Sequence, residues 1–323
     1  MTLMHREIEA FLQQFSYKPE VELADRLGHF EKFLITGMGG SHLAADLLRV
    51  WQPELSLTIH SDYGLPVGEL TSNTLIIASS YSGKTEETLD GFKAAHEQGL
   101  PIAAVSIGGK LLELAREWRV SYVQLPDTGI QPRLAIGLQL RALLALMGRP
   151  DLLTELISLT DQLKPAMLES KAQALAETLK GQIPVVYASA RNFPLAYYWK
   201  ISLNETAKSP AFANVFPESN HNELSGFDVQ PGTRSLVQPF HLIFLTDATD
   251  HPQIQKRMMI LARLYGERGV PVTVRALTGL SLPHKIFSSV LLAILTAHEL
   301  AARYQVEPEA VPLNDELKRL VAE

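Results

Sequence analysis

Hydrophobic and polar positions follow two alternating patterns along the chain. Short apolar runs such as 32–37 and 74–80 are typical of buried parallel strands. The stretches 41–51 and 85–99, which follow them, carry apolar residues at helical spacing. The same alternation restarts in the second half, where the expected strands are 183–190, 241–247 and 270–277. We therefore expect an α/β fold with two parallel sheets, each flanked by helices.

The alternation divides the chain into two halves. A length of 323 residues is typical of two domains. The apolar helix expected at 134–148 ends at Gly148-Arg149-Pro150, and a long helical stretch of mixed polarity, 151–181, follows it. We predict an N-terminal domain over 1–150 and a C-terminal domain over 151–323, which ends in a further helix.

Composition narrows the possible functions. The chain has no cysteine, which excludes disulfides and thiolate chemistry, and its net charge of −6 with no basic block disfavours nucleic acid as a partner. The N-terminus lacks the apolar core of a signal peptide. The apolar run 286–297 is too short and too polar to span a membrane. The histidines show no metal-ligand spacing. We expect a cytoplasmic protein that needs no metal or other cofactor.

Two loops rich in small residues follow predicted strands and precede predicted helices. The first, GMGGS at 37–41, lets the backbone approach a ligand closely at Gly39 and Gly40 and adds the hydroxyl of Ser41, which we expect to cap the next helix. A helix N-terminus after such a loop is suited to binding phosphate. A tight strand–helix turn without a ligand explains the same residues equally well.

The second loop, SSYSGKT at 79–85, is richer in hydroxyl groups. Ser80, Ser82 and Thr85 surround Gly83, and their hydroxyls match phosphate oxygens without requiring a high net charge. A serine/threonine turn with Thr85 as a helix cap is the alternative. The nucleotide-binding P-loop is rejected, because its pattern needs glycine where this chain has Ala78.

The segment 204–223, NETAKSPAFANVFPESNHNE, carries side chains suited to proton transfer. Glu205 follows an aromatic-rich helical run, where partial burial would make it a better base. His221 lies sixteen residues later, and Asn220, Asn222 and Glu223 could fix its tautomer. A solvated helix glutamate and a hydrogen-bonding loop histidine are the alternatives.

Arg133 stands in QPRLAIG, directly before an apolar helix. At such a junction a guanidinium can stabilise an anion through charge-assisted hydrogen bonds. A surface arginine is an equally good explanation of this residue taken alone.

Taken together, these segments resemble a known family. GMGGS, SYSG-x-TEET, PR-x-A-x-G, NE-x-AK-x-PAF-x-N-x-FPE-x-NHNE and DELK-x-x-L resemble the bifunctional phosphoglucose/phosphomannose isomerases, which belong to the sugar-isomerase (SIS) domain group. The resemblance covers about 30 to 320. It implies two SIS domains, a homodimer with active sites at the interface, and interconversion of glucose 6-phosphate and fructose 6-phosphate, with mannose 6-phosphate as a further substrate.

The resemblance also implies residue roles. Glu205 would move the proton between C1 and C2, Arg133 would stabilise the enediolate, and His221 of the neighbouring subunit would help to open the pyranose ring. Lys318 in DELKRL would assist ring opening. The residues that would hold the sugar phosphate are Gly39, Gly40, Ser41, Ser80, Ser82 and Thr85.

Two positions depart from the family pattern. Lys84 stands where asparagine is common, so it either contacts phosphate or faces solvent. Val311 and Pro312 stand where some members have a threonine that is linked to mannose substrates, which puts the second activity in question.

Two other functions remain as alternatives. A non-catalytic SIS module that senses a sugar phosphate would usually carry an appended DNA-binding or other domain, and the sequence shows none. An isomerase of an amino sugar phosphate or a pentose phosphate would share the same loops and differ only in the shape of its pocket.

Overall fold

A computed structural model describes residues 3–68 and 70–321. They form two compact units, Met1–Leu163 and Lys164–Glu323. The sequence placed the boundary after residue 150. In the structure the first unit also includes the helices α6 (Pro150–Ile157) and α7 (Leu159–Gln162), because they pack against the last long helix of that unit and against its N-terminal segment. The predicted α/β fold with two parallel sheets is confirmed.

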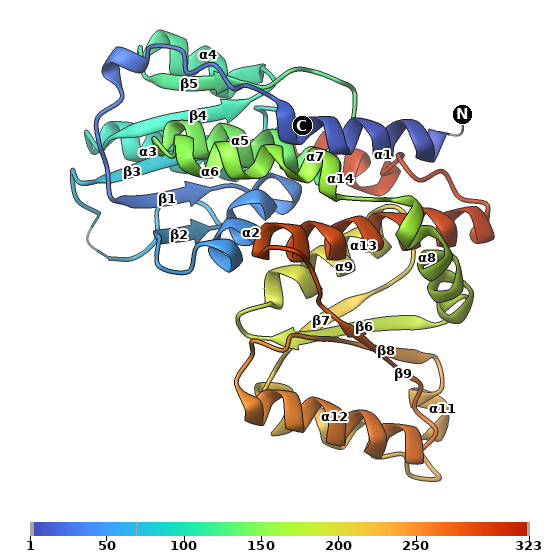
Figure 1. The fold of residues 1–323 in the computed structure, drawn as a ribbon. Coiled ribbons are helices and arrows are strands. Elements are labelled where there is room, and N and C mark those ends of the chain that lie inside the picture. The colour runs from blue at the N-terminus through green and yellow to red at the C-terminus, as the bar shows by residue number, and fades with distance from the viewer. Residues whose placement is uncertain (1–2, 69, 322–323) are drawn as a thin grey trace. The chain divides into compact units, whose positions relative to one another are not determined.

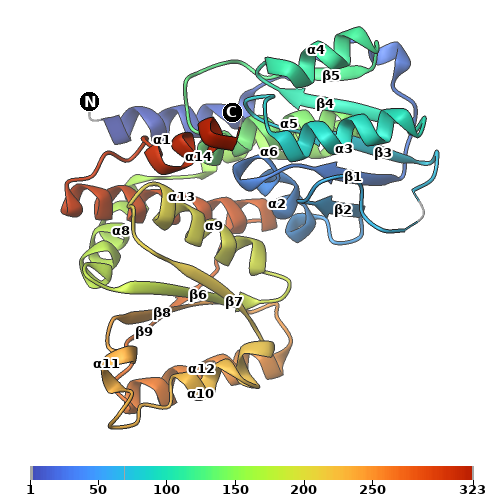
Figure 2. The same cartoon turned by 180° about the vertical axis from the view of Figure 1, so that it is seen from behind.

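The first unit is a five-stranded parallel sheet in the order β2-β1-β3-β4-β5. Figures 1 and 2 show its two faces, with α5 and α6 in front of the sheet in one view and α3 and α4 in front in the other. The strands are β1 (Lys32–Thr36), β2 (Ser56–His60), β3 (Thr74–Ser79), β4 (Ile102–Ser106) and β5 (Ser121–Gln124). The remaining helices are α1 (Leu3–Gln13), α2 (Leu43–Trp51), α3 (Glu86–Glu97), α4 (Gly109–Glu117) and α5 (Ile136–Leu146), with short 3-10 turns η1 (Gln14–Ser16), η2 (Ala24–Arg26), η3 (Gly39–Ser41) and η4 (Pro132–Leu134).

Strand β3 is buried along its whole length, as its uninterrupted apolar sequence predicts for a parallel strand covered on both faces. On one face, apolar residues of α3 and α4 such as Phe92 and Leu111 pack against Ile76 and Ala104 of the sheet. This packing fixes the positions at which the strands end, and therefore where the loops that follow them lie.

The second unit is a four-stranded parallel sheet in the order β7-β6-β8-β9. Its strands are β6 (Ile183–Ser189), β7 (Phe212–Phe216), β8 (Phe240–Thr246) and β9 (Val272–Ala276). In Figure 1, α8 (Ala166–Leu179), α9 (Phe193–Glu205) and α13 (Leu282–Tyr304) lie on one side of this sheet, and α12 (Pro252–Glu267) lies on the other. Shorter elements are η5 (Glu218–Asn220), α10 (Glu223–Gly226), α11 (Arg234–Val237) and the terminal α14 (Pro312–Val321).

The structure differs from the sequence-based expectation in two elements. The stretch 151–181 forms three helices instead of one, interrupted at Ser158 and again at Leu163, Lys164 and Pro165, where a proline ends helical hydrogen bonding. Strand β7 was not predicted, because it is short and mixes Asn214 with Phe212, which is exposed. The polar segment 204–223 therefore contains an edge strand of the sheet.

Helix α13 is long and apolar enough to cross a membrane by length and composition. In this structure 72 % of its most apolar window is buried, against α8 and α9. It is thus the central core helix of the second unit, which accounts for the apolar run that the sequence shows at 286–297.

Candidate functional site

The order of strands in the first unit places both small-residue loops at one point. The connection after β1 runs through α2 to β2 on one side, and β3 lies on the other side of β1. In open parallel sheets, ligands bind at such a switch point, beyond the carboxyl ends of the strands. The loops 37–41 and 80–85 follow β1 and β3 directly, so both lie at this edge.

Direct hydrogen bonds join the two loops. The hydroxyl of Ser79 donates to the carbonyl oxygen of Ser41 at 2.7 Å, and the backbone N–H of Tyr81 donates to the hydroxyl of Ser41 at 3.0 Å. The prediction that Ser41 caps α2 is wrong, since His42 is the capping residue and the Ser41 side chain is occupied by the neighbouring loop. The role of Ser41 in the structure is to hold the two loops in register.

Glycine is required on the inner side of these loops. A Cβ on Gly37 would lie 2.7 Å from the carbonyl oxygen of Ser79, and a Cβ on Gly83 would lie 1.9 Å from that of Gly108. Gly39 has φ +52, yet a Cβ there would meet no atom within 4 Å. Its surroundings are open, as a backbone that contacts a ligand would need.

The hydroxyls of the second loop have unequal environments. Ser80 is fully buried, and its Oγ lies 2.9 Å from Oγ1 of Thr85 and accepts from the N–H of Gly83 at 3.1 Å. Thr85 stands at the N-cap of α3 without a side-chain capping bond, so the first N–H groups of that helix keep no intrahelical partner. Ser82 and Lys84 are exposed. These hydroxyls and N–H groups form a cradle suited to phosphate oxygens.

Arg133 adjoins this cradle through its backbone. A Cβ on Gly40 would lie 2.9 Å from the backbone nitrogen of Arg133, so η4 packs directly on the first loop. The Arg133 side chain is only 2 % exposed. A buried guanidinium beside a phosphate cradle is unlike the surface arginine considered as the alternative, because a charged group is rarely buried without a partner or function.

Sequence reasoning missed His42 and Asp46. They stand four positions apart at the start of α2, and Nδ1 of His42 contacts the carboxylate of Asp46. The i, i+4 spacing in the sequence was the available signal. Because His42 follows Ser41 directly, it is a titratable group at the edge of the cradle.

Glu205 is the last residue of α9 in the second unit and is partly buried. The motif around it also stabilises the local structure. Asn204 accepts a hydrogen bond from the N–H of Ala211 at 2.7 Å, which holds the connection between α9 and β7. Lys208 has φ +54 and donates to the carbonyls of Glu205 and Pro308, so a cation completes the C-terminus of α9. The NETAK sequence thus fixes the end of the helix that carries Glu205.

His221 follows β7 and is exposed. Two of the three neighbours that sequence reasoning assigned to its orientation have other partners: Glu223 accepts from Tyr187 and Asn214, and Asn222 donates to Glu218 at 3.4 Å. Burial and the hydrogen bond to Glu223 raise the pKa of Tyr187, which keeps it a neutral donor. Glu223 therefore anchors the segment that carries His221 to the sheet, and we correct its expected role.

Glu205 and His221 lie beyond opposite ends of strand β7. Helix α9 starts beyond the carboxyl end of β6 and returns to the amino end of β7, so Glu205 precedes that strand and His221 follows it. Five strand residues at about 3.3 Å each separate the two ends by roughly 17 Å. Lys318 is exposed on α14, a helix described in full that buries none of its residues.

The second sheet has its own switch point, between β6 and β8, and it differs from the first. Two buried carboxylates, Asp247 and Asp250, lie there, with Ser189 donating to Asp250 at 2.8 Å and Lys285 donating to Asp247 at 2.9 Å. Asn192 donates to both carboxylates.

The pKa values of these two carboxylates move in opposite directions. Burial opposes ionisation of Asp247, but hydrogen bonds from Thr249 and Lys285 outweigh it and lower the pKa. Burial raises the pKa of Asp250, and the charge of Asp247 adds to that effect. At the switch point of the second sheet, carboxylates therefore stand where the first unit offers N–H groups and hydroxyls. Their negative charge would repel phosphate.

Comparison with known proteins covers nearly the whole chain. A family model described as the bacterial phospho-glucose isomerase C-terminal SIS domain matches residues 168–321. A bifunctional phosphoglucose/phosphomannose isomerase of Caldicellulosiruptor bescii is 35 % identical over 312 residues, which covers 91 % of this chain and 90 % of that protein. The chain belongs to the bifunctional phosphoglucose/phosphomannose isomerase family. The resemblance inferred from its motifs is confirmed.

Other members and neighbours extend the comparison. A family member from Aquifex aeolicus is 30 % identical and covers 98 % of each chain. A D-glucosamine-6-phosphate 4-epimerase of Sulfolobus acidocaldarius is 31 % identical over 220 residues, or 67 % of this chain and 68 % of that protein. The C-terminal domain of glucosamine-fructose-6-phosphate aminotransferase from Francisella tularensis has a TM-score of 0.71 at 13 % identity and covers 95 % of this chain and 96 % of that one, which shows a shared fold.

Proposed function

We propose that this member of the phosphoglucose/phosphomannose isomerase family interconverts glucose 6-phosphate and fructose 6-phosphate and also acts on mannose 6-phosphate. The observation that carries the proposal is identity of 30 to 35 % with bifunctional isomerases over nearly the whole chain. The cradle formed by the loops at 37–41 and 80–85 supports it, because a phosphate held away from the reacting carbons supplies binding energy that orients them.

We assign the phosphate to Gly39, Gly40, Ser41, Ser80, Ser82 and Thr85. Within this set, Gly39 and the N-terminus of α3 offer backbone groups to the phosphate, whereas Ser41 and Ser80 shape the loops through their hydrogen bonds. Arg133 would stabilise the enediolate oxygen, since a cation near a developing oxyanion lowers the barrier.

Proton transfer is assigned to the second unit. Glu205 would remove the proton from C2 of the open-chain aldose and return it to C1, while the hydroxyl proton moves from O2 to O1. The reaction is then balanced as an isomerisation with no net gain or loss of electrons. His221 and Lys318 would act earlier, as proton donor and acceptor in opening the sugar ring.

The test is turnover of fructose 6-phosphate, with glucose 6-phosphate and mannose 6-phosphate separated as products. We expect both products to form, and the mannose product decides whether Val311-Pro312 is compatible with the second activity. Binding of fructose 6-phosphate without any product would overturn the proposal in favour of a sensor. Turnover of glucosamine 6-phosphate alone would favour the epimerase reaction named for the Sulfolobus relative.

We also propose a homodimer in which His221 serves the active site of the neighbouring subunit. The support is the separation of Glu205 and His221 along β7, because side chains beyond opposite ends of a strand do not reach one small substrate. Symmetric dimers are the commonest assembly of soluble enzymes.

Subunit mixing tests this arrangement. We expect Glu205→Gln and His221→Gln homodimers to be nearly inactive. After the two variants are mixed, half of the dimers are hybrids with one of two sites intact, so the mixture as a whole recovers about a quarter of wild-type activity. Light scattering gives the mass before and after mixing. A monomeric protein, or dimers that exchange subunits and stay inactive, would refute the shared site.

A further inference from the structure

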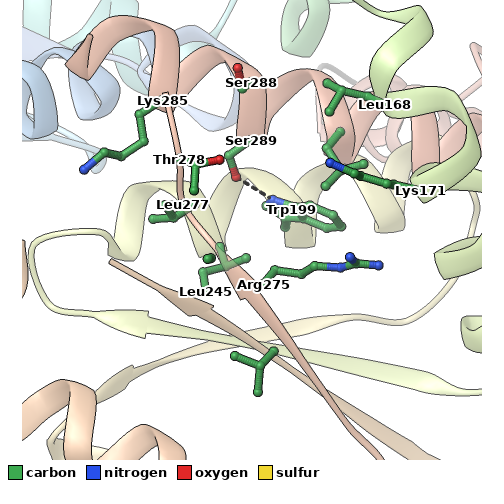
Figure 3. Close-up of a pocket in the computed structure, with 13 residues that line it drawn as sticks. Leu168, Lys171, Trp199, Leu245, Arg275, Leu277, Thr278, Lys285, Ser288 and Ser289 are labelled. Carbon is green, nitrogen blue, oxygen red and sulfur yellow. Dashed lines mark hydrogen bonds between the residues drawn. The ribbon is translucent and has the colours of Figure 1, made fainter. Parts of the chain in front are cut away.

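We infer that the second unit carries a binding site for a small organic anion, separate from the residues assigned to catalysis. A cavity of about 160 Å³ lies between β8, the edge strand β9 and the helices α8, α9 and α13. Figure 3 shows it, with Arg275 and Lys171 beside the ring of Trp199 and Lys285 pointing away from them. All of its lining residues belong to this unit.

The charges around the cavity are unbalanced. Its lining holds three cations, Lys171, Arg275 and Lys285, and no Asp or Glu among the residues described there. Lys285 is already neutralised, because its ammonium donates to both carboxylate oxygens of Asp247 at 2.9 and 3.1 Å. Lys171 and Arg275 have no ion pair within the described part of the chain, so they leave a positive potential at the cavity.

Arg275 supplies a second and independent observation. Its Nε is buried and has no hydrogen-bond partner among the described residues. A buried donor left without a partner costs the full free energy of its desolvation, and the penalty is larger for a charged group. An anion that accepts from Nε would remove that penalty, and the planar guanidinium is suited to two parallel bonds with a phosphate or carboxylate.

The rest of the wall combines apolar side chains with the hydroxyls of Thr278, Ser288 and Ser289. Trp199 is fully buried, and its Nε1–H donates to the hydroxyl of Ser289 at 3.1 Å, which holds the indole in one orientation. Leu168, Leu245 and Leu292 complete this side. An apolar cavity of about 150 Å³ holds one benzene molecule, so this one accepts a ring or a short hydrocarbon chain. The ligand class is therefore a small anion with an apolar body.

The position of the cavity distinguishes it from the proposed active site. The cavity adjoins β9, whereas Glu205 and His221 flank β7, at the opposite edge of the four-stranded sheet. On α9, which carries both Trp199 and Glu205, Glu205 lies six residues beyond Trp199, or about 9 Å further along the helix from the cavity wall. The inference rests on the cavity alone, so it stands or falls independently of the isomerase reaction.

Fluorine NMR of protein labelled with 5-fluorotryptophan tests the site. The chain has three tryptophans, and Trp199→Phe assigns the resonance at the cavity. We expect phenyl phosphate to shift the Trp199 resonance in a saturable manner, while phenol, its neutral counterpart, gives no saturable shift. The same titration with inorganic phosphate measures how much of the binding comes from the anion without the aromatic ring.

Charge variants identify the residues. We expect Lys171→Gln with Arg275→Gln to weaken phenyl phosphate binding by about tenfold or more, since both charge-assisted contacts are lost. Lys180→Gln with Lys256→Gln, an equal change of charge at two exposed positions of the same unit, should leave it unchanged. Isomerase turnover of each variant checks folding, and thermal unfolding does so if turnover is absent. The inference fails if the Trp199 resonance does not respond, if phenol shifts it equally, or if the double variant binds like wild type.

Discussion

Glu205→Gln lowers kcat for fructose 6-phosphate by about 10²–10⁴-fold while KM changes little, if Glu205 is the base that moves the proton between C1 and C2. Glutamine keeps the size of the side chain and removes only its ability to take up a proton. Glu205 is partly buried at the end of a helix whose geometry is fixed by Asn204 and Lys208, so the substitution leaves the fold unchanged.

Glu117→Gln is the matched control, because Glu117 is exposed on α4 and undergoes the same chemical change. We expect its kinetics to equal those of wild type. Exchange of a C1 proton of fructose 6-phosphate with solvent, or of the C2 proton of glucose 6-phosphate, gives a second readout of the base. If Glu205→Gln retains more than about one part in a hundred of wild-type turnover, Glu205 is not the base.

Gly83→Ala raises KM for fructose 6-phosphate by about tenfold or more and destabilises the first unit. The new Cβ would lie 1.9 Å from the carbonyl oxygen of Gly108, a backbone atom that moves only with its loop. The loop that carries Ser82 and Thr85 must shift in response, and the phosphate cradle shifts with it. Overpacking of this kind typically costs about 1–3 kcal/mol of unfolding free energy.

Gly99→Ala separates this steric effect from backbone strain. Gly99 has the same φ of +66 as Gly83, but a Cβ there meets no atom within 4 Å. Both substitutions lower the free energy of unfolding by about 1 kcal/mol, because alanine is unfavourable in the left-handed conformation. Only Gly83→Ala adds a steric clash with Gly108. Chemical unfolding and steady-state kinetics of the pair provide the comparison. Equal effects of the two substitutions would show that the approach to Gly108 does not matter.

Much of the first unit could be predicted because its signals are local. The apolar run of β3 and the glycines and hydroxyls that follow it stand together in the sequence, and the structure joins them at one sheet edge. The contacts of Ser41 could not be predicted, because its partner, Tyr81, lies forty residues away and is brought there by the pairing of β1 with β3.

The second unit was harder to predict from the sequence, because its contacts also join residues that are distant along the chain. Strand β7 has only five residues and lies inside a polar segment, so its local pattern does not mark it as a strand, and its pairing with β6 determines its conformation. The expected partners of His221 were chosen for being adjacent in sequence, whereas Glu223 reaches Tyr187 and Asn214 on the sheet. The burial of Arg133 also depends on packing between η4 and η3, which no local pattern encodes.

The two switch points differ in which side chains lie there, and this difference indicates how two units of similar architecture can have different functions. At the second one, Asp247 and Asp250 with Lys285 and Asn192 satisfy one another, so neither charge nor space favours an incoming sugar phosphate. Under the proposed function we therefore expect one sugar phosphate per chain at these two positions. Under the proposed function, the first unit holds the phosphate, whereas the second unit closes the equivalent position with its own side chains and contributes Glu205 and His221 to proton transfer.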